Sequence, residues 1–339
     1  MPSPSATGRR SIAVVTGASG GVGRACAIEL ARRGYDVALV ARGEDGLRAT
    51  ADDVLAHGGQ ALAIAADVGD WSAVERATAE VEQRLGPIDV GINNAMATVF
   101  GPVADVTAEE IHRATLTTYF GQVHGTLAAL AVMRPRDRGT IVQVSSTLAR
   151  RSIPLQAAYC GAKAAARAFS EAVRTELLHD GSRVRISQVV LPAVNTPQFG
   201  WSRSTMPLAP RPVAPVYSPE RAARAIVGAA RRAPRQRILG AWNRTVLALD
   251  AIAPGVLDHA AALGSWDGQQ IDGVEVGRRA GNLDRPLDDA PGTDRGASGA
   301  FGREDGGVLD RAFLRSLPDE PRTLGRGAVA RAREVLRWG

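Results

Sequence analysis

Residues 11–23 read Ser-Ile-Ala-Val-Val-Thr-Gly-Ala-Ser-Gly-Gly-Val-Gly, an apolar run that leads directly into a glycine-rich loop. The run predicts a buried strand, and the pattern that follows near 22–33 predicts a helix. Glycines allow a tight turn and let the backbone approach a pyrophosphate, whose charge the free N–H groups and dipole of the helix favour. The stretch therefore predicts a dinucleotide site, with a ligand-free cluster of loop glycines as the alternative, and the candidate contacts are Gly17, Gly21, Val22 and Gly23.

The same order of apolar run and helical pattern repeats along residues 9–240. Strands are expected at 11–16, 36–41, 60–65, 88–92, 139–145, 184–190 and 236–240. Helices are expected near 22–33, 44–57, 70–85, 107–134, 155–179 and 219–232, the fourth of which opens with a capping box of Thr107 and Glu110. Continuous apolar strands are typical of sheets buried on both faces. We therefore expect an α/β fold, a doubly wound Rossmann-type parallel sheet of about seven strands with helices on both faces.

The composition bounds the class of protein. The chain has 339 residues, of which 45% are apolar and 22% charged, as is typical of a soluble globular protein. Cys26 and Cys160 are the only cysteines, which excludes a disulfide framework and favours a reducing compartment. The N-terminus shows no apolar core of a signal peptide, and no stretch of about 18 apolar residues follows. We expect a cytoplasmic protein without an integral membrane segment, and we identify no metal-ligand set.

Basic side chains are distributed unevenly along the chain. The net charge is +6, and residues 201–240 hold eight arginines against one acid, Glu220. A solvated helix surface explains such a cluster. No aromatic residues interleave with its arginines from Arg221 on, which argues against nucleic acid as a partner. Peripheral contact with an anionic membrane stays open.

The residue after the second expected strand selects between NAD and NADP. A carboxylate there would hydrogen-bond the ribose 2′-hydroxyl of NAD, whereas this sequence has Arg42. A guanidinium can pair with a 2′-phosphate and the Ser19 hydroxyl can add a donor, so we expect NADP(H) rather than NAD(H); the alternative is an ordinary surface arginine. Asp67, after the third strand, can accept from the adenine amino group. Other contacts are expected where the third and fourth strands end, unless these residues only form turns: Val68, Asn93 and Ala95.

Tyr159 and Lys163 are four residues apart in an expected helix, which places them on one face about one turn apart. A phenol titrates near pH 10, and a nearby ammonium lowers that pKa, so the pair can serve as a general acid/base. Ser146 lies at the end of the fifth strand, where its hydroxyl can hydrogen-bond a substrate oxygen. Taken alone, a Tyr–Lys pair is ordinary helix-surface chemistry. However, Lys163 is the single Lys among 41 basic residues, and such a position is expected to need a property that Arg lacks.

Together, the motifs Thr-Gly-x-x-x-Gly-x-Gly, Asn-Asn-Ala and Ser-x12-Tyr-x3-Lys and a later Pro…Thr pair resemble those of the short-chain dehydrogenase/reductase family over residues 9–240. The resemblance implies a nicotinamide-dependent oxidoreductase that interconverts a ketone or aldehyde and an alcohol. It implies Tyr159 as the acid/base and Ser146 as the group that orients the carbonyl. It implies that Lys163 lowers the Tyr pKa and holds the nicotinamide ribose. We also expect a homodimer or homotetramer.

Three positions depart from the family pattern. Met96 replaces the glycine after Asn-Asn-Ala, Ala193 replaces the glycine after Pro192, and Thr118 stands where many members have an Asn. That Asn usually helps to hold a water in the proton relay from the Lys, so Thr118 is expected to offer its hydroxyl or its backbone carbonyl instead. Pro192 and Thr196 resemble the family positions that meet the carboxamide side of the nicotinamide.

Residues 197–218 stand where the family has its substrate lid, and they contain five prolines and seven large apolar or aromatic side chains. This composition favours a lipophilic small-molecule substrate, unless the side chains only pack the lid or a second subunit. Residues 241–339 form a C-terminal extension that is expected to be partly irregular and to wrap the core or trail from it. Within it, 264–307 are too polar to bury the surface that ordering requires, and amphipathic patterns follow near 308–316 and 326–338.

Two functions follow from these features. The first is an NADP(H)-dependent oxidoreductase, which the intact Ser146, Tyr159 and Lys163 favour. The second is a non-catalytic NADP-binding sensor or scaffold protein, which Thr118, Met96 and the long extension favour.

Overall fold

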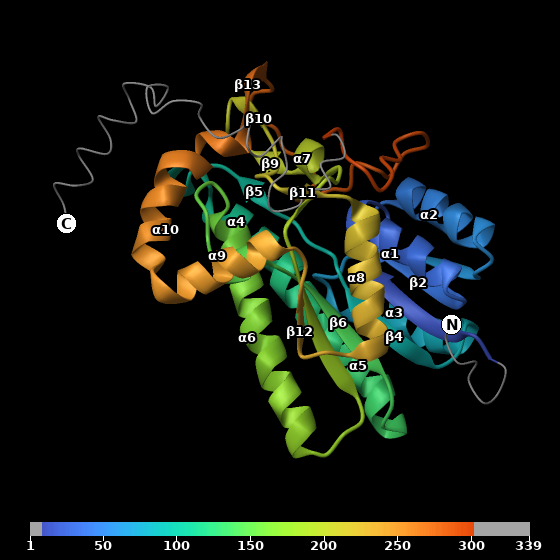
Figure 1. Ribbon diagram of the computed structural model, residues 1–339. Helices are drawn as coiled ribbons and strands as arrows, with labels where there is room; N and C mark the ends of the chain where they lie inside the picture. The colour runs from blue at the N-terminus through green and yellow to red at the C-terminus, as the bar shows by residue number, and fades with distance from the viewer. Residues whose placement is uncertain (1–8, 302–339) are drawn as a thin grey trace.

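A seven-stranded sheet forms the centre of the molecule. The structure, a computed structural model, describes residues 9–301. The strand order is β12-β7-β6-β4-β1-β2-β3, and every neighbouring pair is parallel (Figure 1). The strands are β1 (Ser11–Thr16), β2 (Tyr35–Ala41), β3 (Ala61–Ala65), β4 (Ile88–Asn93), β6 (Thr140–Ser146), β7 (Arg185–Leu191) and β12 (Gln236–Ile238). The doubly wound parallel sheet expected from the sequence is confirmed.

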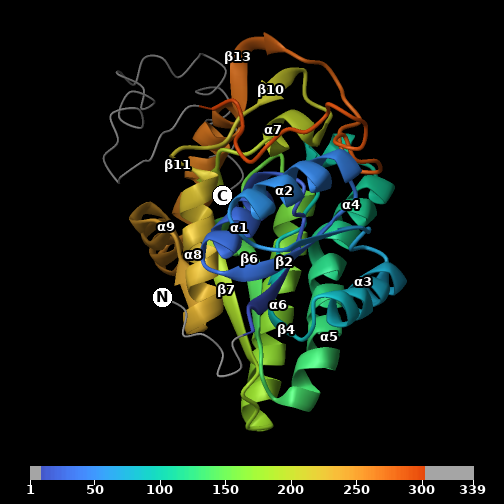
Figure 2. The same ribbon diagram turned by 90° about the vertical axis from the view of Figure 1, so that its right-hand side faces the viewer.

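Helices cover both faces of this sheet and bury two apolar layers. The main helices are α1 (Gly21–Arg32), α2 (Glu44–Ala56), α3 (Trp71–Arg84), α4 (Ala108–Thr115), α5 (Gly121–Met133), α6 (Ala157–His179) and α8 (Pro219–Arg232). Apolar side chains of α1, α2 and α8 form one core with the sheet, and those of α3, α5 and α6 form another. Figure 2 shows α1, α2 and α8 together on the side that faces the viewer.

Shorter elements connect these layers and build the rim of the sheet. They are β5 (Val99–Phe100), η1 (Val103–Asp105), η3 (Arg134–Arg136), η4 (Thr147–Ala149), β8 (Ala193–Val194), α7 (Gln198–Trp201), β9 (Arg203–Ser204), β10 (Leu208–Pro210) and β11 (Val216–Tyr217). β5 pairs with β9 and β8 with β11, so the segment expected as a lid is fastened to the rim by backbone hydrogen bonds.

The helix expected over 107–134 is interrupted. Its start is confirmed, because the Glu110 amide donates to Thr107 Oγ1 over 3.2 Å and the Thr107 amide donates to Glu110 Oε2 over 3.0 Å. A π-helical turn, η2 (Leu116–Phe120), then separates α4 from α5. Such turns widen a helix locally and often lie at functional sites. A smooth helical periodicity does not reveal one extra residue in a turn, so the sequence predicted a single helix.

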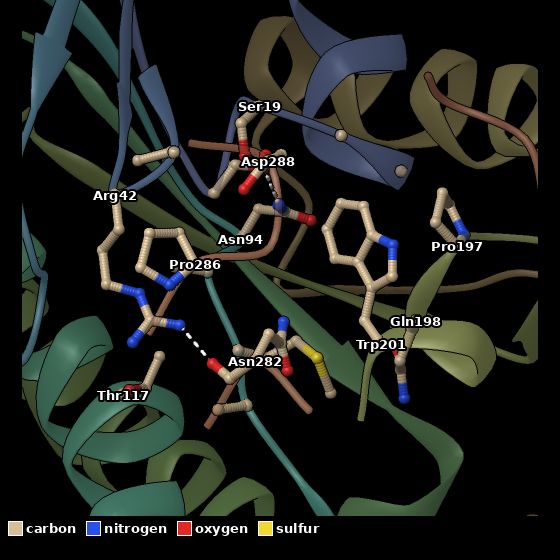
Figure 3. Close-up of a pocket in the computed structure, with 18 of the residues that line it drawn as sticks. Ser19, Arg42, Asn94, Thr117, Pro197, Gln198, Trp201, Asn282, Pro286 and Asp288 are labelled. Atoms are coloured by element: carbon tan, nitrogen blue, oxygen red, sulfur yellow. Dashed lines mark hydrogen bonds between the residues drawn. The ribbon is translucent and has the colours of Figure 1, made fainter. Parts of the chain in front are cut away.

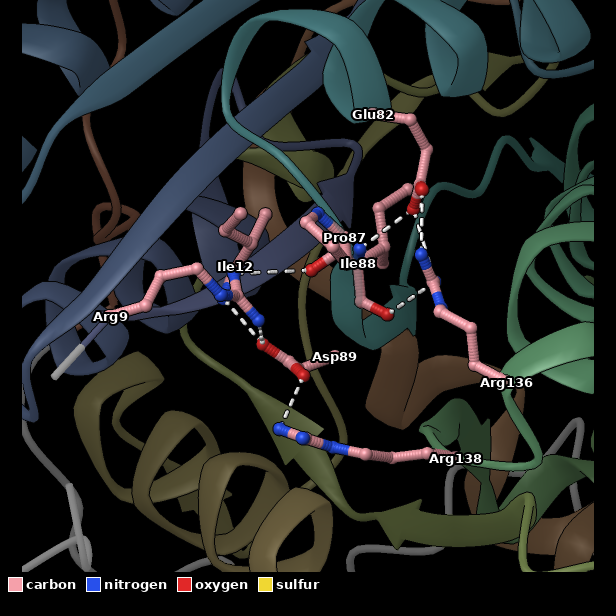
Figure 4. A network of polar contacts seen from close by, with 8 residues as sticks. All are labelled: Arg9, Ile12, Glu82, Pro87, Ile88, Asp89, Arg136 and Arg138. Carbon is pink, nitrogen blue, oxygen red and sulfur yellow. Dashed lines mark hydrogen bonds and ion pairs between the residues drawn. The ribbon is translucent and has the colours of Figure 1, made fainter. Parts of the chain in front are cut away.

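The amino-terminal edge of the sheet is tied by charged side chains, far from the ends where ligands bind in such folds. Asp89 accepts from Arg9 Nη2 over 2.9 Å and from the Ile12 amide over 3.1 Å, and it pairs with Arg138 (Figure 4). Close to Asp89, Glu82 accepts a hydrogen bond from Arg136. These contacts join β1, β4 and the chain that leads into β6.

After residue 240 the chain forms two helices, α9 (Ala241–Ile252) and α10 (Pro254–Ala260), a π-helical turn η5 (Ala261–Ser265), η6 (Asp267–Gln269) and a strand β13 (Gln270–Glu275). β13 pairs antiparallel with β10. The expected lack of order over 264–307 is therefore wrong for 264–301. This segment has no core of its own but is held by earlier parts of the chain: Leu283 is 2% exposed, and the Asn282 amide donates to Trp201 O. The patterns near 308–316 and 326–338 lie outside the described residues.

Within residues 9–301, no single helix has the length and apolar composition needed to cross a bilayer. The pair Ala241–Ile252 and Pro254–Ser265, bent by 120°, meets both requirements when its two members are taken together.

Candidate active site and cofactor site

Two adjoining cavities lie at the carboxyl ends of the central strands, the edge where open α/β sheets bind ligands. The first, which we call the glycine-loop cavity, has a volume of about 170 Å³ and is lined by the loop after β1 and by Arg42. The second, the Tyr159 cavity, has a volume of about 410 Å³. The two share lining residues, Val22, Asn94, Met96, Thr196 and Gln198, so one elongated ligand can reach both.

The glycine-rich loop has the geometry that its sequence predicts. Gly17 has φ +65°, and a Cβ on Gly23 would lie 2.0 Å from the Gly17 carbonyl oxygen, so only glycine fits at these positions. Gly17, Ser19, Gly21 and Val22 line the glycine-loop cavity, while Gly23 packs beneath it. The cradle for a pyrophosphate at the amino end of α1 is therefore present.

Arg42 faces the glycine-loop cavity from the end of β2. It donates through Nη1 to the backbone oxygens of Leu283 and Asp284 over 3.1 and 3.3 Å, and through Nη2 to that of Asn282 (Figure 3). Burial lowers the pKa of the Arg42 guanidinium. Arg42 is thus no ordinary surface arginine, but the acceptors it meets come from the C-terminal extension.

The residues expected after β3 and β4 take different positions. Asp67, Val68 and Ala95 line the glycine-loop cavity. Asp67 accepts from the Gly69 amide over 2.8 Å and pairs with Arg113. Although burial alone raises the pKa of the Asp67 carboxyl, these two donors outweigh it and lower the pKa.

The prediction for Asn93 needs correction. Its side chain points into the core and donates to Thr126 Oγ1 over 3.2 Å, and it lines neither cavity. Asn94, one residue on, lines both cavities and donates through Nδ2 to Thr16 O over 3.0 Å. Strand alternation sends successive side chains to opposite faces, so a slip of one residue exchanges core and cavity.

Ser146, Tyr159 and Lys163 come together on the wall of the Tyr159 cavity, as expected. Ser146 ends β6, and the other two lie in the first turns of α6. The Ser146 hydroxyl is hydrogen-bonded to the Tyr159 phenol and also accepts from the Leu148 amide over 3.1 Å. The strand end and the helix start thus place a hydroxyl, a phenol and an ammonium around one space.

The expectation that Lys163 lowers the pKa of Tyr159 needs correction. Burial raises the pKa of Tyr159 to about 12, and the hydrogen bond with Ser146 offsets this only in part. Lys163 is 2% exposed, donates to Val144 O over 2.7 Å, and has its Nζ 5.8 Å from the centre of the Tyr159 ring. Burial lowers the pKa of Lys163 to about 7. Desolvation is the largest cause of both pKa shifts, so in this structure the phenol keeps its proton at neutral pH.

Thr118 does not present its hydroxyl to either cavity, contrary to expectation. The residue is fully buried in the π-helical turn, where Oγ1 donates to Ala97 O over 2.7 Å and accepts from the Ala97 amide over 2.9 Å. The hydroxyl therefore uses both its donor and its acceptor capacity in hydrogen bonds with the backbone of Ala97. A contribution of its backbone carbonyl to a proton relay stays a prediction.

The segment after β7 supplies part of both cavities. Pro192 lines the Tyr159 cavity and Thr196 lines both. In the expected lid, Phe199 and Val213 line the Tyr159 cavity, whereas Met206 packs against Phe100 and Leu155. The apolar side chains of the lid are thus divided between cavity and packing.

Elements α9, α10 and η5 form a wall of the Tyr159 cavity that the sequence did not predict. It includes Trp242, Val246, Leu257, Ala260 and Ala261. These residues recur at helical spacing, but nothing local in the sequence indicates which part of the core a helix after residue 240 covers.

Comparison with known proteins agrees with this site. Residues 11–206 match the family model described as short chain dehydrogenase. The chain is 30% identical over 250 residues to the oxidoreductase YxnA of Bacillus subtilis (strain 168), which covers 73% of this chain and 70% of that protein. It is 32% identical over 222 residues to the 3-ketodihydrosphingosine reductase of Bos taurus, which covers 63% of this chain and 66% of the relative.

A solved structure shares the architecture. The alcohol dehydrogenase of the archaeon Thermococcus sibiricus, in complex with 5-hydroxy-NADP, superimposes with a TM-score of 0.58 at 29% identity and covers 68% of this chain and 96% of its own. The chain belongs to the short-chain dehydrogenase family. It is an oxidoreductase of the class that acts on carbonyl and alcohol substrates with NAD(P)H.

Proposed function

We propose that the protein interconverts a lipophilic ketone or aldehyde and its alcohol with NADP(H), and that Tyr159 is its acid/base. The arrangement of Ser146, Tyr159 and Lys163 on the wall of a cavity of about 410 Å³ carries this proposal. The cavity is within the range of about 300–1,000 Å³ that suits a small organic ligand.

The chemistry of the three side chains is complementary. The nicotinamide supplies or accepts the hydride when bound. In the direction of reduction, the protonated phenol of Tyr159 gives its proton to the substrate oxygen, which the Ser146 hydroxyl holds by a hydrogen bond. A raised phenol pKa keeps that proton available at neutral pH. Lys163, the single Lys of the chain, places its side-chain nitrogen beside the phenol, 5.8 Å from the centre of the Tyr159 ring.

The preference for NADP(H) rests on Arg42 and the glycine-rich loop. The loop offers backbone donors for a pyrophosphate, and Arg42 points its guanidinium into the same cavity, where a 2′-phosphate is a suitable partner. Ser19 and Thr196 line this cavity and can hold other parts of the cofactor. The archaeal relative in complex with an NADP derivative supports this preference.

The substrate class rests on the lining of the Tyr159 cavity. Apart from the polar groups near Tyr159, its walls are largely aliphatic or aromatic, with Phe199, Val213, Trp242, Val246 and Leu257 among them. Such a surface binds hydrocarbon better than sugar. The bovine relative, named for the reduction of 3-ketodihydrosphingosine, supports a keto substrate.

A test of this function combines a substrate panel with one variant. Purified protein is assayed for NADPH oxidation against ketones of increasing chain length and against a polar keto sugar, and the long-chain ketones are expected to give the higher kcat/KM. Tyr159→Phe removes only the ionisable hydroxyl and is expected to lower kcat by about a hundredfold or more, the usual size of general acid catalysis. NADPH binding by fluorescence titration is expected to be retained.

Tyr119→Phe is the matched control, since it removes a phenol hydroxyl outside the Tyr159 cavity and is expected to leave kcat unchanged. Full activity of Tyr159→Phe would contradict the assignment. Binding of NADPH without turnover of any ketone or alcohol would favour a redox sensor or scaffold instead.

A further inference from the structure

A segment of the C-terminal extension, residues 282–301, lies across the glycine-loop cavity; we call it the strap. In Figures 1 and 2 it is the orange-to-red chain that runs above α1 and α2. Its backbone enters the space between Arg42 and the glycine-rich loop, with Asn282, Pro286 and Asp288 among the residues that line the cavity (Figure 3).

The strap is hydrogen-bonded to Arg42, the cationic side chain that lines the cavity. Three successive carbonyl oxygens, those of residues 282–284, accept from the guanidinium of Arg42. A guanidinium presents five N–H donors, and the two terminal nitrogens, which form its bidentate fork, are both engaged here. A 2′-phosphate that pairs with Arg42 must replace these carbonyls.

The strap also occupies two helix amino-termini. The Gly21 amide, at the start of α1, donates to Gly296 O over 3.1 Å. The amides of Asp45 and Gly46, at the start of α2, donate to Asp288 O over 3.1 and 3.2 Å. Free amides at such positions attract anions, and the first of them belongs to the loop that receives a pyrophosphate. Carbonyl oxygens of one segment thus stand at the places suited to phosphate oxygens.

A buried carboxylate of the strap also lies where a phosphate group could bind. Asp288 is 4% exposed, and its Oδ2 has no hydrogen-bond partner among the described residues. Its carboxylate packs so closely against Gly43 and Gly46 that a Cβ on either glycine would lie 2.0 or 2.5 Å from one of its oxygens. Burial of a carboxylate oxygen without a hydrogen-bond partner is unfavourable. Arg42 is close enough to Asp288 to interact with its charge, so an anionic phosphate in the place of this carboxylate would meet the same guanidinium.

Ion pairs and hydrogen bonds fasten the strap at its far end. Asp294 accepts from Arg24 Nη1 over 2.6 Å, and Asp45 Oδ2 accepts from the Thr293 and Asp294 amides over 2.9 and 3.0 Å. Phe301 packs edge-on against Phe199 with 5.6 Å between ring centres. None of these contacts uses the cofactor donors, so they hold the strap independently of them.

We propose that the strap is an intramolecular competitor of the cofactor, which binds the adenosine-phosphate half of the site and must leave before NADP(H) enters. This inference rests on the proposed function. The glycine-loop cavity beside the strap measures only about 170 Å³, below the roughly 300 Å³ of the smallest typical ligand pockets. The strap carries four Asp against two Arg, so it disfavours an anionic ligand next to it.

The strap therefore competes with the cofactor; it is not a roof that closes over it. A roof would leave the phosphate donors free and add new ones, whereas the strap consumes Arg42 and the amides at the starts of α1 and α2 with its own oxygens. The Tyr159 cavity stays open at the same time. The strap thus limits access to the cofactor cavity without limiting access to the substrate cavity.

The test weakens the strap at a residue outside the cofactor machinery. Asp294→Ala removes the ion pair with Arg24 and is expected to tighten NADPH binding by about fivefold, as expected for loss of one partly buried ion pair. Asp53→Ala is the matched control, because Asp53 accepts from Nε of the same Arg24 over 2.7 Å but lies on α2. It is expected to leave NADPH affinity unchanged. Equal or weaker NADPH binding by Asp294→Ala would overturn the proposal.

Hydrogen exchange provides a readout that does not depend on turnover. If the strap competes, saturating NADPH speeds exchange in a peptide that spans the Thr293 and Asp294 amides, which now donate to Asp45. If the strap instead closes over the cofactor, exchange there slows, which would also overturn the proposal.

A full-length variant with residues 282–299 replaced by Gly and Ser in equal number separates failure of this inference from failure of the proposed function. Binding of NADPH tighter than in the wild type supports the strap as a competitor. Binding no tighter than in the wild type overturns the competitor but leaves the cofactor assignment intact. No NADPH binding, in a variant that keeps its cooperative thermal melt, overturns the proposed cofactor and the competitor with it.

Discussion

Lys163 shows how burial gives a common side chain an uncommon property. It is the single Lys of the chain, lies buried in the first turns of α6, and donates a hydrogen bond to the Val144 carbonyl. Burial brings its pKa to about 7, so the side chain can exist in either protonation state near neutrality. A guanidinium stays protonated at any accessible pH and needs more room. This difference explains why the position keeps Lys in a chain that otherwise uses Arg.

Exchange of Lys163 for Arg is expected to lower kcat by about a hundredfold or more, because the planar guanidinium can neither fit the space beside Tyr159 nor release a proton. The measurement is steady-state NADPH oxidation with the best ketone of the panel. Arg183→Lys, an exchange of the same pair of residue types at an exposed site, is the control and should have no effect. Turnover of Lys163→Arg within about twofold of the wild type would show that the lone Lys is a compositional accident.

The buried ammonium also predicts how stability depends on pH. Between about pH 7 and 10.5 the unfolded chain binds a proton at Lys163 that the folded chain does not, so the free energy of unfolding rises with pH in this window. Relative to Lys163→Met, the wild type is expected to gain up to about 1.4 kcal/mol per pH unit. Below pH 7 both states are protonated and the difference becomes constant.

Urea unfolding of both proteins between about pH 7 and 9.5 measures this slope, and the difference between the two cancels all other titrating groups. Tyr159, with its pKa near 10 in the unfolded chain and raised to about 12 in the folded state, begins to titrate near the upper limit, and this contribution is common to both proteins. Parallel stability curves for the two proteins would show that Lys163 is solvated in the folded state.

Helix α8 shows how one element supports the cofactor loop without touching it. The helix packs against α1, the helix that begins at the glycine-rich loop, and both belong to the same core cluster. Ile226 is fully buried in this cluster, whereas Arg224 on the same helix is exposed to solvent. The apolar side of α8 thus packs against α1, while Arg224 faces solvent.

Ile226→Ala is expected to lower the free energy of unfolding by about 2–5 kcal/mol, because it removes buried methyl groups and leaves a cavity in the core that α8 shares with α1 and the sheet. Arg224→Ala on the exposed side should change it by less than about 0.5 kcal/mol. Urea unfolding followed by circular dichroism measures both. A loss below about 1 kcal/mol for Ile226→Ala would show that α8 can move to fill the space.

The molecule as a whole places two parts of the C-terminal extension on two parts of the site. The strap lies on the cofactor side, whereas α9 and α10 form a wall of the Tyr159 cavity on the substrate side (Figure 1). Arg151 holds these helices, with Nη1 3.2 Å from Asp250 and Nη2 2.7 Å from Asp258. The side chain of Arg151 itself lines the cavity.

Loss of the ion pairs between Arg151 and the two helices is expected to affect KM more than kcat. Arg151→Ala should raise KM for a long-chain ketone by about fivefold, the size of one partly buried ion pair, and leave kcat within about twofold. Asp258→Ala tests the same contact from the extension and should behave alike. Arg150→Ala, which removes only a pairing with Glu171 at 3.7 Å, is the control and should keep KM unchanged. An unchanged KM in Arg151→Ala would show that the wall does not depend on the ion pairs of Arg151.

The order of elements and the motif residues could be predicted from the sequence because both depend on neighbours along the chain. Six of the seven expected strands formed at or within a residue of the expected bounds, as in Ser11–Thr16 and Thr140–Ser146. The seventh, expected at 236–240, ends two residues earlier, at Ile238. The glycine pattern predicted a turn that only glycine can make, and the spacing of Tyr159 and Lys163 predicted one helix face. Local sterics and periodicity determine each of these features.

Other features depend on contacts between residues that are far apart in the chain, and no local pattern contains them. Arg42 donates to backbone carbonyls about 240 residues later in the chain, and the Thr118 hydroxyl is hydrogen-bonded to the backbone of Ala97. Asn94, rather than Asn93, lines the cavity. The polar segment after residue 264 was expected to lack order because it has no core of its own. The segment is ordered because the folded core supplies hydrogen-bond donors to its backbone carbonyls. These donors come close together only after the strands, the glycine-rich loop and α2 have folded.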